Sequence, residues 1–183
     1  MLTKFYDKKL NYDGSQLRPL FNYLDHGLLG DSCVAFIGQC DVSFDHMVDG
    51  EDLLEKSQIK SDEMLHFLFE VFDTNLMSGV FLQRLFASIV QNLIYKKTGQ
   101  LLARSGDDLY LNDQKLSISI ATRSINSVLV HFAMNVTNAG TPVKTLSLQD
   151  LKIEPINFAK ELLQLVSAEY VDIKKATYKV KCV

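Results

Sequence analysis

An excess of positive charge and a long apolar run are both missing from this sequence. The chain has 19 lysines and arginines against 22 aspartates and glutamates, for a net charge of -3. Affinity for duplex DNA comes mainly from basic side chains that neutralise phosphates, so this balance argues against a broad nucleic-acid footprint. No segment approaches the roughly 20 apolar residues that a membrane-spanning helix needs. We therefore expect neither DNA nor a membrane as a partner.

The chain has few cysteines, and their spacing shows no paired motif. The chain contains Cys33, Cys40 and Cys182, an odd number without a Cys-x-x-Cys spacing. A disulfide framework needs an even set, and a zinc knot needs closely spaced pairs. We expect reduced thiols, and the segment Met1–Asn11 lacks the apolar core of a secretory signal. The expected location is the cytoplasm.

Prolines and glycine-rich linkers are also scarce. The three prolines are widely separated, and no internal repeat or low-complexity segment divides the chain. At 183 residues, one hydrophobic core can bury most of the apolar surface. The sequence therefore predicts one domain spanning residues 1–183.

Two segments carry the pattern of buried strands. Residues Ser32–Val42 are rich in β-branched and aromatic residues and follow a Gly-Asp turn signal. The segment Glu63–Asp73 is ambiguous, because its apolar residues fit both a helical stripe and a strict alternation. On the strand interpretation, His66 and Glu70 share one face, opposite the apolar one.

Apolar residues at spacings of three and four predict the helices. The pattern is strongest over Gly79–Lys97, which ends in two lysines before Gly99. A short helix is expected over Asp49–Lys56, with acidic residues in its first turn. A last helix is predicted over Asn157–Glu169, followed by a short strand from Tyr170.

Between the two long helices the sequence predicts an antiparallel meander. Its strands are expected at Leu101–Arg104, Asp108–Leu111, Leu116–Thr122 and Val128–Val136, joined by polar turns. The sum is an α+β fold, a mostly antiparallel sheet with helices packed against it.

Lys115 is the residue whose position points most clearly to chemistry. It lies between the polar turn Asn112-Asp113 and the alternating strand that begins at Leu116. A lysine so placed can direct its ammonium inward, at a phosphate or a carboxylate. The alternative is a solvated turn lysine, and the spacing alone leaves both open.

Two histidines and a glutamate form a second candidate group. On one face of a strand, His66 and Glu70 could act as a base and the residue that orients it, or as metal ligands. His131, which lies in the last predicted strand of the meander, could join them. The alternative for each histidine is a hydrogen-bonded core residue. No HxH or HExxH spacing exists, so we predict no permanent metal site.

Arg84, Asp31 and Asp108 complete the residues expected to bind a substrate. Arg84 has apolar neighbours and could hold a carboxylate or phosphate through paired hydrogen bonds, or form a structural salt bridge to Glu70 or Asp73. Asp31 and Asp108 could cap turns, or could bind Mg²⁺ and ribose hydroxyls.

Several short motifs together carry a resemblance to a known family over nearly the whole chain. The chain closely resembles the uncharacterised prokaryotic family known as domain of unknown function 366. The motifs are Asp13-Gly14-Ser15, Gly30-Asp31-Ser32, Met47-Val48-Asp49, Ser61 to Phe67, Gln83-Arg84-Leu85, Gly106 to Tyr110, Lys115 to Thr122 and Gly140-Thr141-Pro142.

That family in turn is similar to the fold of biotin-protein ligases, lipoate ligases, octanoyltransferases and class II aminoacyl-tRNA synthetases. The local likeness is a polar turn, Lys115, a strand, and then a strand that ends in Asn135-Val136. In the ligases and acyltransferases the matching lysine touches the acyl carbonyl and, where one forms, the adenylate phosphate. The resemblance thus implies a catalytic role for Lys115, with Asn135 among the substrate-binding residues.

The sequence departs from those enzymes in two places. The glycine- and arginine-rich loop that holds phosphates is not visible, which leaves the use of ATP and Mg²⁺ open. The region Thr137–Val143 lacks the acyl-accepting cysteine of octanoyltransferases. We expect an enzyme that binds a small carboxylate or acyl compound, with Lys115 stabilising negative charge that develops on oxygen. The alternative is a non-catalytic module that binds a metabolite or a protein. Ligase-like domains often pair, so a homodimer is an expected assembly.

Overall fold

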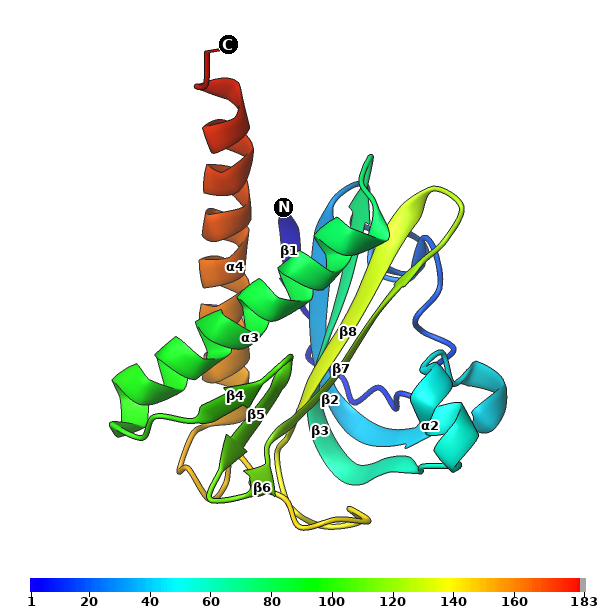
Figure 1. Cartoon of the computed structure of the whole chain (residues 1–183), viewed down its shortest axis with the longest axis vertical. Helices are drawn as coiled ribbons and strands as arrows, with labels where there is room; N and C mark the ends of the chain where they lie inside the picture. Colours follow the sequence, from blue (N-terminus) through cyan, green and yellow to red (C-terminus); the bar gives the residue numbers. More distant parts are fainter. Residues whose placement is uncertain (182–183) are drawn as a thin grey trace.

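The computed structural model describes residues 1–181 and places a five-stranded sheet at its centre (Figure 1). The strand order is β1-β2-β3-β8-β7. All neighbouring pairs run antiparallel except β1 and β2, which are parallel. The mostly antiparallel α+β fold expected from the sequence is confirmed. The strands are β1 (Leu2–Phe5), β2 (Ser32–Val42), β3 (Ile59–Phe72), β7 (Ser117–Arg123) and β8 (Ser127–Asn135).

The ambiguous segment 63–73 is a strand, the central part of β3. It pairs along its length with β2 on one side and β8 on the other. Its alternation therefore reflects two different buried faces: Phe67 and Phe69 belong to the larger core, whereas Met64 and Leu68 belong to a smaller one. Because both faces of β3 are buried, apolar residues occupy both sets of alternate positions. Some of them therefore also fall at spacings of three and four, which is the pattern of a helix.

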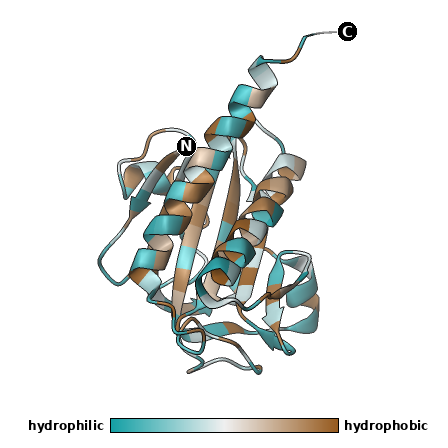
Figure 2. Ribbon diagram, turned by 90° about the vertical axis from the view of Figure 1, so that its left-hand side faces the viewer, coloured by the Kyte–Doolittle hydropathy of each residue, from teal (hydrophilic) through white to brown (hydrophobic). Residues whose placement is uncertain are grey.

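Two long helices cover one face of the sheet. They are α3 (Leu76–Thr98) and α4 (Pro155–Tyr178), and Figure 2 shows them in front of the hydrophobic strands. Phe86 of α3 is fully buried, and its ring packs against those of Phe67, Phe69 and Phe132 at centroid distances of 4.8, 4.9 and 5.1 Å. The helix predicted over Gly79–Lys97 is confirmed, with Asn75 as its N-cap and Gly99 as its left-handed C-cap.

The end of the chain differs from the prediction. The strand expected from Tyr170 does not form, because α4 continues to Tyr178. One helical turn brings Tyr170 and Lys174 to the same side, where the phenol and the ammonium both donate to Oδ2 of Asp31, at 2.8 and 2.6 Å. This contact with a residue 139 positions away extends the helix. It has no signature in the local sequence.

The expected single meander is divided between two sheets. A separate three-stranded sheet contains β4 (Ala103–Ser105), β5 (Asp108–Leu111) and β6 (Gln114–Lys115). The chain then enters the main sheet with the β7–β8 hairpin. The prediction of one continuous meander was therefore wrong, although its strand positions were close.

The second face of the sheet is covered by the segments on either side of β2. The segment that leads into β2, the short helix α1 (Phe21–Leu24), a 3₁₀ turn at Phe44–His46 and the helix α2 (Gly50–Glu55) lie on this side (Figure 1). The helix predicted over Asp49–Lys56 is confirmed, with Asp49 as its N-cap. A second cluster of buried residues, including Tyr12 and Phe36, packs beneath these elements.

Two expectations concern the cysteines and the absence of a membrane-spanning segment, and both can be compared with residues 1–181. Cys33 and Cys40 are buried free thiols, and burial raises the pKa of Cys40 to about 12. Cys182 lies outside the described residues. Within residues 1–181, none of the helices has both the length and the apolar character required to cross a membrane.

Candidate functional site

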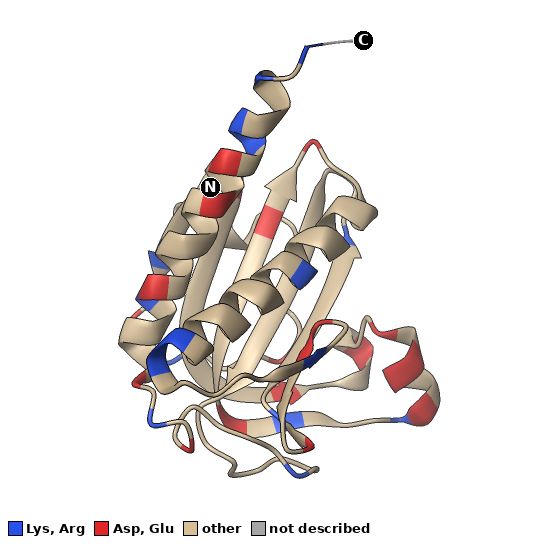
Figure 3. Ribbon diagram, turned by 60° about the vertical axis from the view of Figure 1, so that its left-hand side comes forward, with Lys and Arg blue, Asp and Glu red and all other residues tan. Residues whose placement is uncertain are grey.

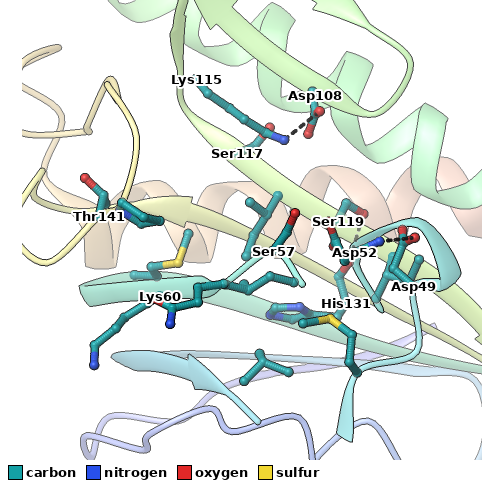
Figure 4. A pocket seen from close by; sticks show the side chains of 18 of the residues that line it. Asp49, Asp52, Ser57, Lys60, Asp108, Lys115, Ser117, Ser119, His131 and Thr141 are labelled. Atoms are coloured by element: carbon teal, nitrogen blue, oxygen red, sulfur yellow. Dashed lines mark hydrogen bonds and ion pairs between the residues drawn. The ribbon is translucent and has the colours of Figure 1, made fainter. Parts of the chain in front are cut away.

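A cavity of about 530 Å³ opens on the face of the sheet opposite α3 and α4. This volume is in the range of small-molecule binding sites. Its base is formed by the cavity side of β3, β7 and β8, and its rim by α2, the β4–β5 turn and residues 141–145 (Figure 4). Four of the residues singled out in the sequence line it: Asp108, Lys115, His131 and Asn135.

Lys115 points into this cavity from the end of β6. Its Nζ forms an ion pair with Oδ2 of Asp108 at 2.8 Å (Figure 4). The hydroxyl of Tyr110 donates to the same oxygen at 3.1 Å. The side chains of Lys115 and Asp108 are 32% and 25% exposed, so the pair is partly shielded from water. The ammonium carries three donors, and Asp108 uses one of them here. Lys115 can therefore bond a ligand oxygen without breaking the pair.

Asn135 fixes the backbone that carries the lysine. Its Nδ2 donates to the carbonyl oxygens of Lys115, Leu116 and Leu146, at 3.3, 3.2 and 3.2 Å. One buried amide thus joins β8 to β6 and to the strand-like segment after residue 144. The amide group therefore holds the backbone of Lys115 against the end of β8.

Arg84 supports the site from outside the cavity. Its Nη2 lies 3.4 Å from Oδ1 of Asp107, in the turn that also carries Asp108. The sequence offered a salt bridge to Glu70 or Asp73 as the structural alternative, and both of those partners were wrong. Gln83, the neighbour of Arg84 on α3, donates to Oδ2 of Asp107 at 2.9 Å. The Gln-Arg pair therefore holds the β4–β5 turn against α3.

The cavity has a surplus of negative charge. Among residues 1–181, its lining includes five carboxylates and two lysines, Lys60 and Lys115. Three of the carboxylates come from the α2 region, where Figure 3 shows a cluster of acidic residues. Burial, and then repulsion from Asp49, raise the pKa of Asp52. A polyphosphate that entered without a bound cation would face this repulsion. The carboxylates are Asp49, Glu51, Asp52, Asp107 and Asp108.

The two candidate histidines meet beneath the cavity. Nδ1 of His66 lies 3.0 Å from Nε2 of His131, and Nε2 of His66 lies 3.2 Å from the carbonyl oxygen of Gly38. Tyr12 stacks on His131 with ring centroids 3.9 Å apart. His66 is fully buried, and burial lowers its pKa to about 4, while burial also lowers the pKa of His131. Both rings are therefore neutral at pH 7.

Glu70 and Asp31 lie away from the cavity. The carboxylate of Glu70 accepts hydrogen bonds from the backbone N–H of Leu20, at 2.9 Å, and from the hydroxyl of Ser127, at 2.8 Å. Asp31 joins β2 to α4 through Tyr170 and Lys174. Burial raises the pKa of Asp31, but the bond from Lys174 and those from Phe72 and Tyr170 outweigh it and lower the pKa overall. His66 and Glu70 share a face of β3, as the alternation predicted, but their side chains bond to different partners.

Replacing Glu70 with glutamine should destabilise the protein without affecting ligand binding. The N–H of Leu20 also lies 3.1 Å from Oε2 of Glu70, so an amide NH₂ at that position would set two donors against each other, and both remaining bonds to Oε1 would lose the help of the negative charge. The expected loss in the free energy of unfolding is about 1–2 kcal/mol, measured by urea denaturation. A ligand affinity equal to that of the wild type in the same variant would separate this structural role from a binding role. A tenfold weaker affinity with unchanged stability would contradict it.

Several cavity residues have no visible signal in the sequence. Tyr12 comes from the segment that precedes β2, and Thr141 and Pro142 come from the loop after β8. Thr141 and Pro142 belong to a motif of the family resemblance, and Tyr12 directly precedes another, but nothing in their spacing indicates a site. Within residues 1–181, no group of three or more His, Cys, Asp or Glu side chains could hold a metal ion.

The comparisons with known proteins define a family and a fold. The model of a family described as "Domain of unknown function (DUF366)" matches residues 1–181. An uncharacterized protein of Methanocaldococcus jannaschii is 34% identical, over 86% of this chain and 78% of the relative. A solved structure of a protein of unknown function from Pyrococcus horikoshi is 35% identical and superposes with a TM-score of 0.94, covering 99% of each chain.

More distant structures share the fold. A biotin protein ligase mutant from Aquifex aeolicus, in complex with biotin, has a TM-score of 0.62 and 13% identity, covering 98% of this chain and 72% of the ligase. A candidate lipoate protein ligase from T. acidophilum, with bound lipoic acid, has a TM-score of 0.57 and 12% identity, covering 94% and 87% of the two chains. The chain therefore has a biotin/lipoate ligase-like fold, as the resemblance implied.

Proposed function

The chain belongs to the DUF366 family, and from this premise and its ligase-like fold we propose that it binds a small acyl compound in the cavity and acts on its acyl group. Lys115 is the residue that meets the acyl oxygen. The main support for this proposal is the position of Lys115. Its side chain lines the cavity, and its Nζ is held by Asp108 at 2.8 Å. A fixed ammonium in a shielded site stabilises negative charge that develops on a carbonyl oxygen during acyl transfer.

The charge of the cavity favours a neutral acyl group over a free carboxylate. Asp108 already balances the charge of Lys115, and the remaining carboxylates outnumber the remaining lysine. An ester, thioester or amide carbonyl accepts a hydrogen bond from Lys115 without adding negative charge. A free acid would add one more carboxylate to those already present.

A thermal-shift panel tests this proposal. The probes are the N-acetylcysteamine thioester of octanoic acid, free octanoate, biotin, lipoate and Mg-ATP. A ligand at a hundred times its dissociation constant should stabilise the protein by about 2.7 kcal/mol, which raises the melting temperature by roughly 5–11 °C. We expect the largest shift with the thioester. A panel in which no acyl compound raises the melting temperature would count against the proposal.

Three variants assign the effect to Lys115. Lys115→Met removes the ammonium but keeps the length of the side chain, and should reduce the shift to about half or less. Lys175→Met, on the exposed part of α4, is the matched control and should retain it. Asp108→Asn removes the counter-charge of Lys115, so free octanoate should gain affinity relative to the thioester.

The second candidate function is binding without turnover. The observation that favours it is the lack of a glycine-rich phosphate-binding loop in the sequence, together with the acidic lining of the cavity. A binding module would bind the thioester and leave it intact. Incubation with the thioester and a panel of amine and thiol acceptors separates the two functions, since release of N-acetylcysteamine that requires Lys115 would exclude mere binding.

A further inference from the structure

A chain of hydrogen bonds fixes the protons on the two histidines. A carbonyl oxygen can only accept, so Nε2 of His66, 3.2 Å from the oxygen of Gly38, carries a proton. His66 is neutral at pH 7, so its Nδ1 is an acceptor. Nε2 of His131, 3.0 Å from that atom, must then be the donor. In a neutral His131 the remaining nitrogen, Nδ1, is left without a proton.

The bare nitrogen of His131 is available to the cavity. His131 lines the cavity, and among residues 1–181 its Nδ1 has no hydrogen-bond partner. Unlike the two ring nitrogens of His26, it is not sealed off from its surroundings. Tyr12, stacked at 3.9 Å, and the bond to His66 hold the ring in place. A fixed, uncharged acceptor thus faces the binding space.

We infer that His131 is a ligand-recognition residue whose Nδ1 accepts a hydrogen bond from an uncharged N–H or O–H group at the far end of the acyl compound. His66 acts through His131, as the positioning residue that selects its tautomer. This inference rests on the proposed function, because it assumes that the other end of the same ligand meets Lys115.

The sheet register sets the shape of such a ligand. His131 pairs with Ile120, five residues beyond Lys115 along the chain. An extended chain of that length spans at most about 17 Å, and here it passes from β6 to β7. Figure 4 shows Lys115 and His131 on different sides of the cavity. The lysine side chain spans part of this separation. A ligand that contacts both residues is therefore elongated, with an acyl group at one end and a hydrogen-bond donor several carbons away.

The expected substrate class is thus a medium-length acyl compound with a polar, uncharged donor at its distal end. A purely hydrocarbon chain would leave Nδ1 of His131 desolvated and unpaired, which lowers affinity. A bound hydroxyl or amide N–H removes that penalty. Hydrogen-bonding sites of this kind discriminate strongly against analogues that lack the donor.

The first test determines the tautomers of the free protein by ¹⁵N NMR of histidine-labelled samples at pH 7. We expect both His66 and His131 to carry their proton on Nε2. A proton on Nδ1 of His131 would overturn the inference whatever the protein binds. In His66→Phe, where the constraint is removed, the His131 ring should become a mixture of tautomers.

The second test compares two matched thioesters, the S-octanoyl and S-(8-hydroxyoctanoyl) compounds of N-acetylcysteamine. The hydroxylated compound should bind about tenfold more tightly to the wild type and should shift the His131 Nδ1 resonance, and both effects should vanish in His131→Phe. Equal affinities for the wild type, or a preference that persists in His131→Phe, would contradict the inference.

The proposed function and the inference fail in different ways. If neither thioester binds, the acyl proposal fails, and 1-octanol, which has the hydroxyl but no acyl group, decides the role of His131. A shift of the Nδ1 resonance on addition of 1-octanol would support the acceptor role without the acyl site. No shift with 1-octanol would overturn it as well.

Discussion

Replacing Gly38 with alanine is expected to cost about 3 kcal/mol of folding free energy, the upper end of the range for added bulk in a packed site. A Cβ at this position would overlap the carbonyl oxygen and carbon of Leu10, which belong to the backbone of the neighbouring segment. Backbone cannot rotate out of the way as a side chain can, so the segment or the strand must move. Gly38 lies at the irregularity in the β2–β3 pairing, and its carbonyl accepts from His66.

Urea denaturation of Gly38→Ala and Gly50→Ala measures this effect against a matched control. An added Cβ at Gly50 meets nothing within 4 Å, and the position lies in the first turn of α2. Gly50→Ala should therefore be neutral or slightly stabilising. Equal stabilities for the two variants would show that the approach of residues 10 and 11 to β2 is not as close as described.

Acidification from pH 7 to pH 4 is the second change with a large expected effect. Burial lowers the pKa of His66 from 6.5 to about 4, so the unfolded chain binds a proton at a higher pH than the folded protein. The resulting stability is fully present above pH 6.5 and is lost as the pH falls towards 4. For His66 alone the loss is about 3 kcal/mol. His131, whose pKa burial also lowers, adds to it with the same sign.

Stability measured by urea denaturation at several pH values isolates this contribution. The variant His66→Gln/His131→Gln keeps polar groups that do not titrate, so its stability should fall much less between pH 6.5 and 4. Asp52 and Asp107, whose pKa values burial raises, oppose the histidines in this range and remain in both proteins. Parallel profiles for the wild type and the double variant would contradict the assignment.

The sequence allowed the fold to be predicted where local pattern and burial agree. The helical spacing over residues 79–97 reflects one apolar face that packs on the sheet, and α3 forms there. The strand interpretation of residues 63–73 also survives, because side chains alternate between two cores. The C-terminal strand failed because Asp31, far away in sequence, extends α4 through Tyr170 and Lys174.

The site was predictable only where its residues lie near each other in the sequence. Lys115 and Asp108 lie near each other in the chain, on paired strands of a small sheet, so their proximity follows from local turns. The contact between His66 and His131 joins positions 65 residues apart and depends on the register of β3 and β8. Tyr12 reaches the cavity from a turn whose path over β2 no local pattern encodes.

Charged residues that were predicted to bind a substrate instead form structural contacts in the fold. Asp31 and Glu70 have the chemistry of binding residues, yet their carboxylates are occupied by backbone and side-chain donors that fasten α4 and the loop before α1. Arg84 holds the turn that carries Asp107. Sequence identifies the groups that can bind a ligand, but only the fold decides which of them face the cavity.

Isothermal titration calorimetry of the S-octanoyl thioester of N-acetylcysteamine, with the wild type and Lys115→Met, tests the central claim most directly. A charge-assisted hydrogen bond to the acyl oxygen contributes about 1.5–3 kcal/mol, so the dissociation constant of the variant should rise by about 10- to 100-fold. Lys175→Met should match the wild type. Equal dissociation constants for the wild type and Lys115→Met would contradict the claim that Lys115 meets the acyl group.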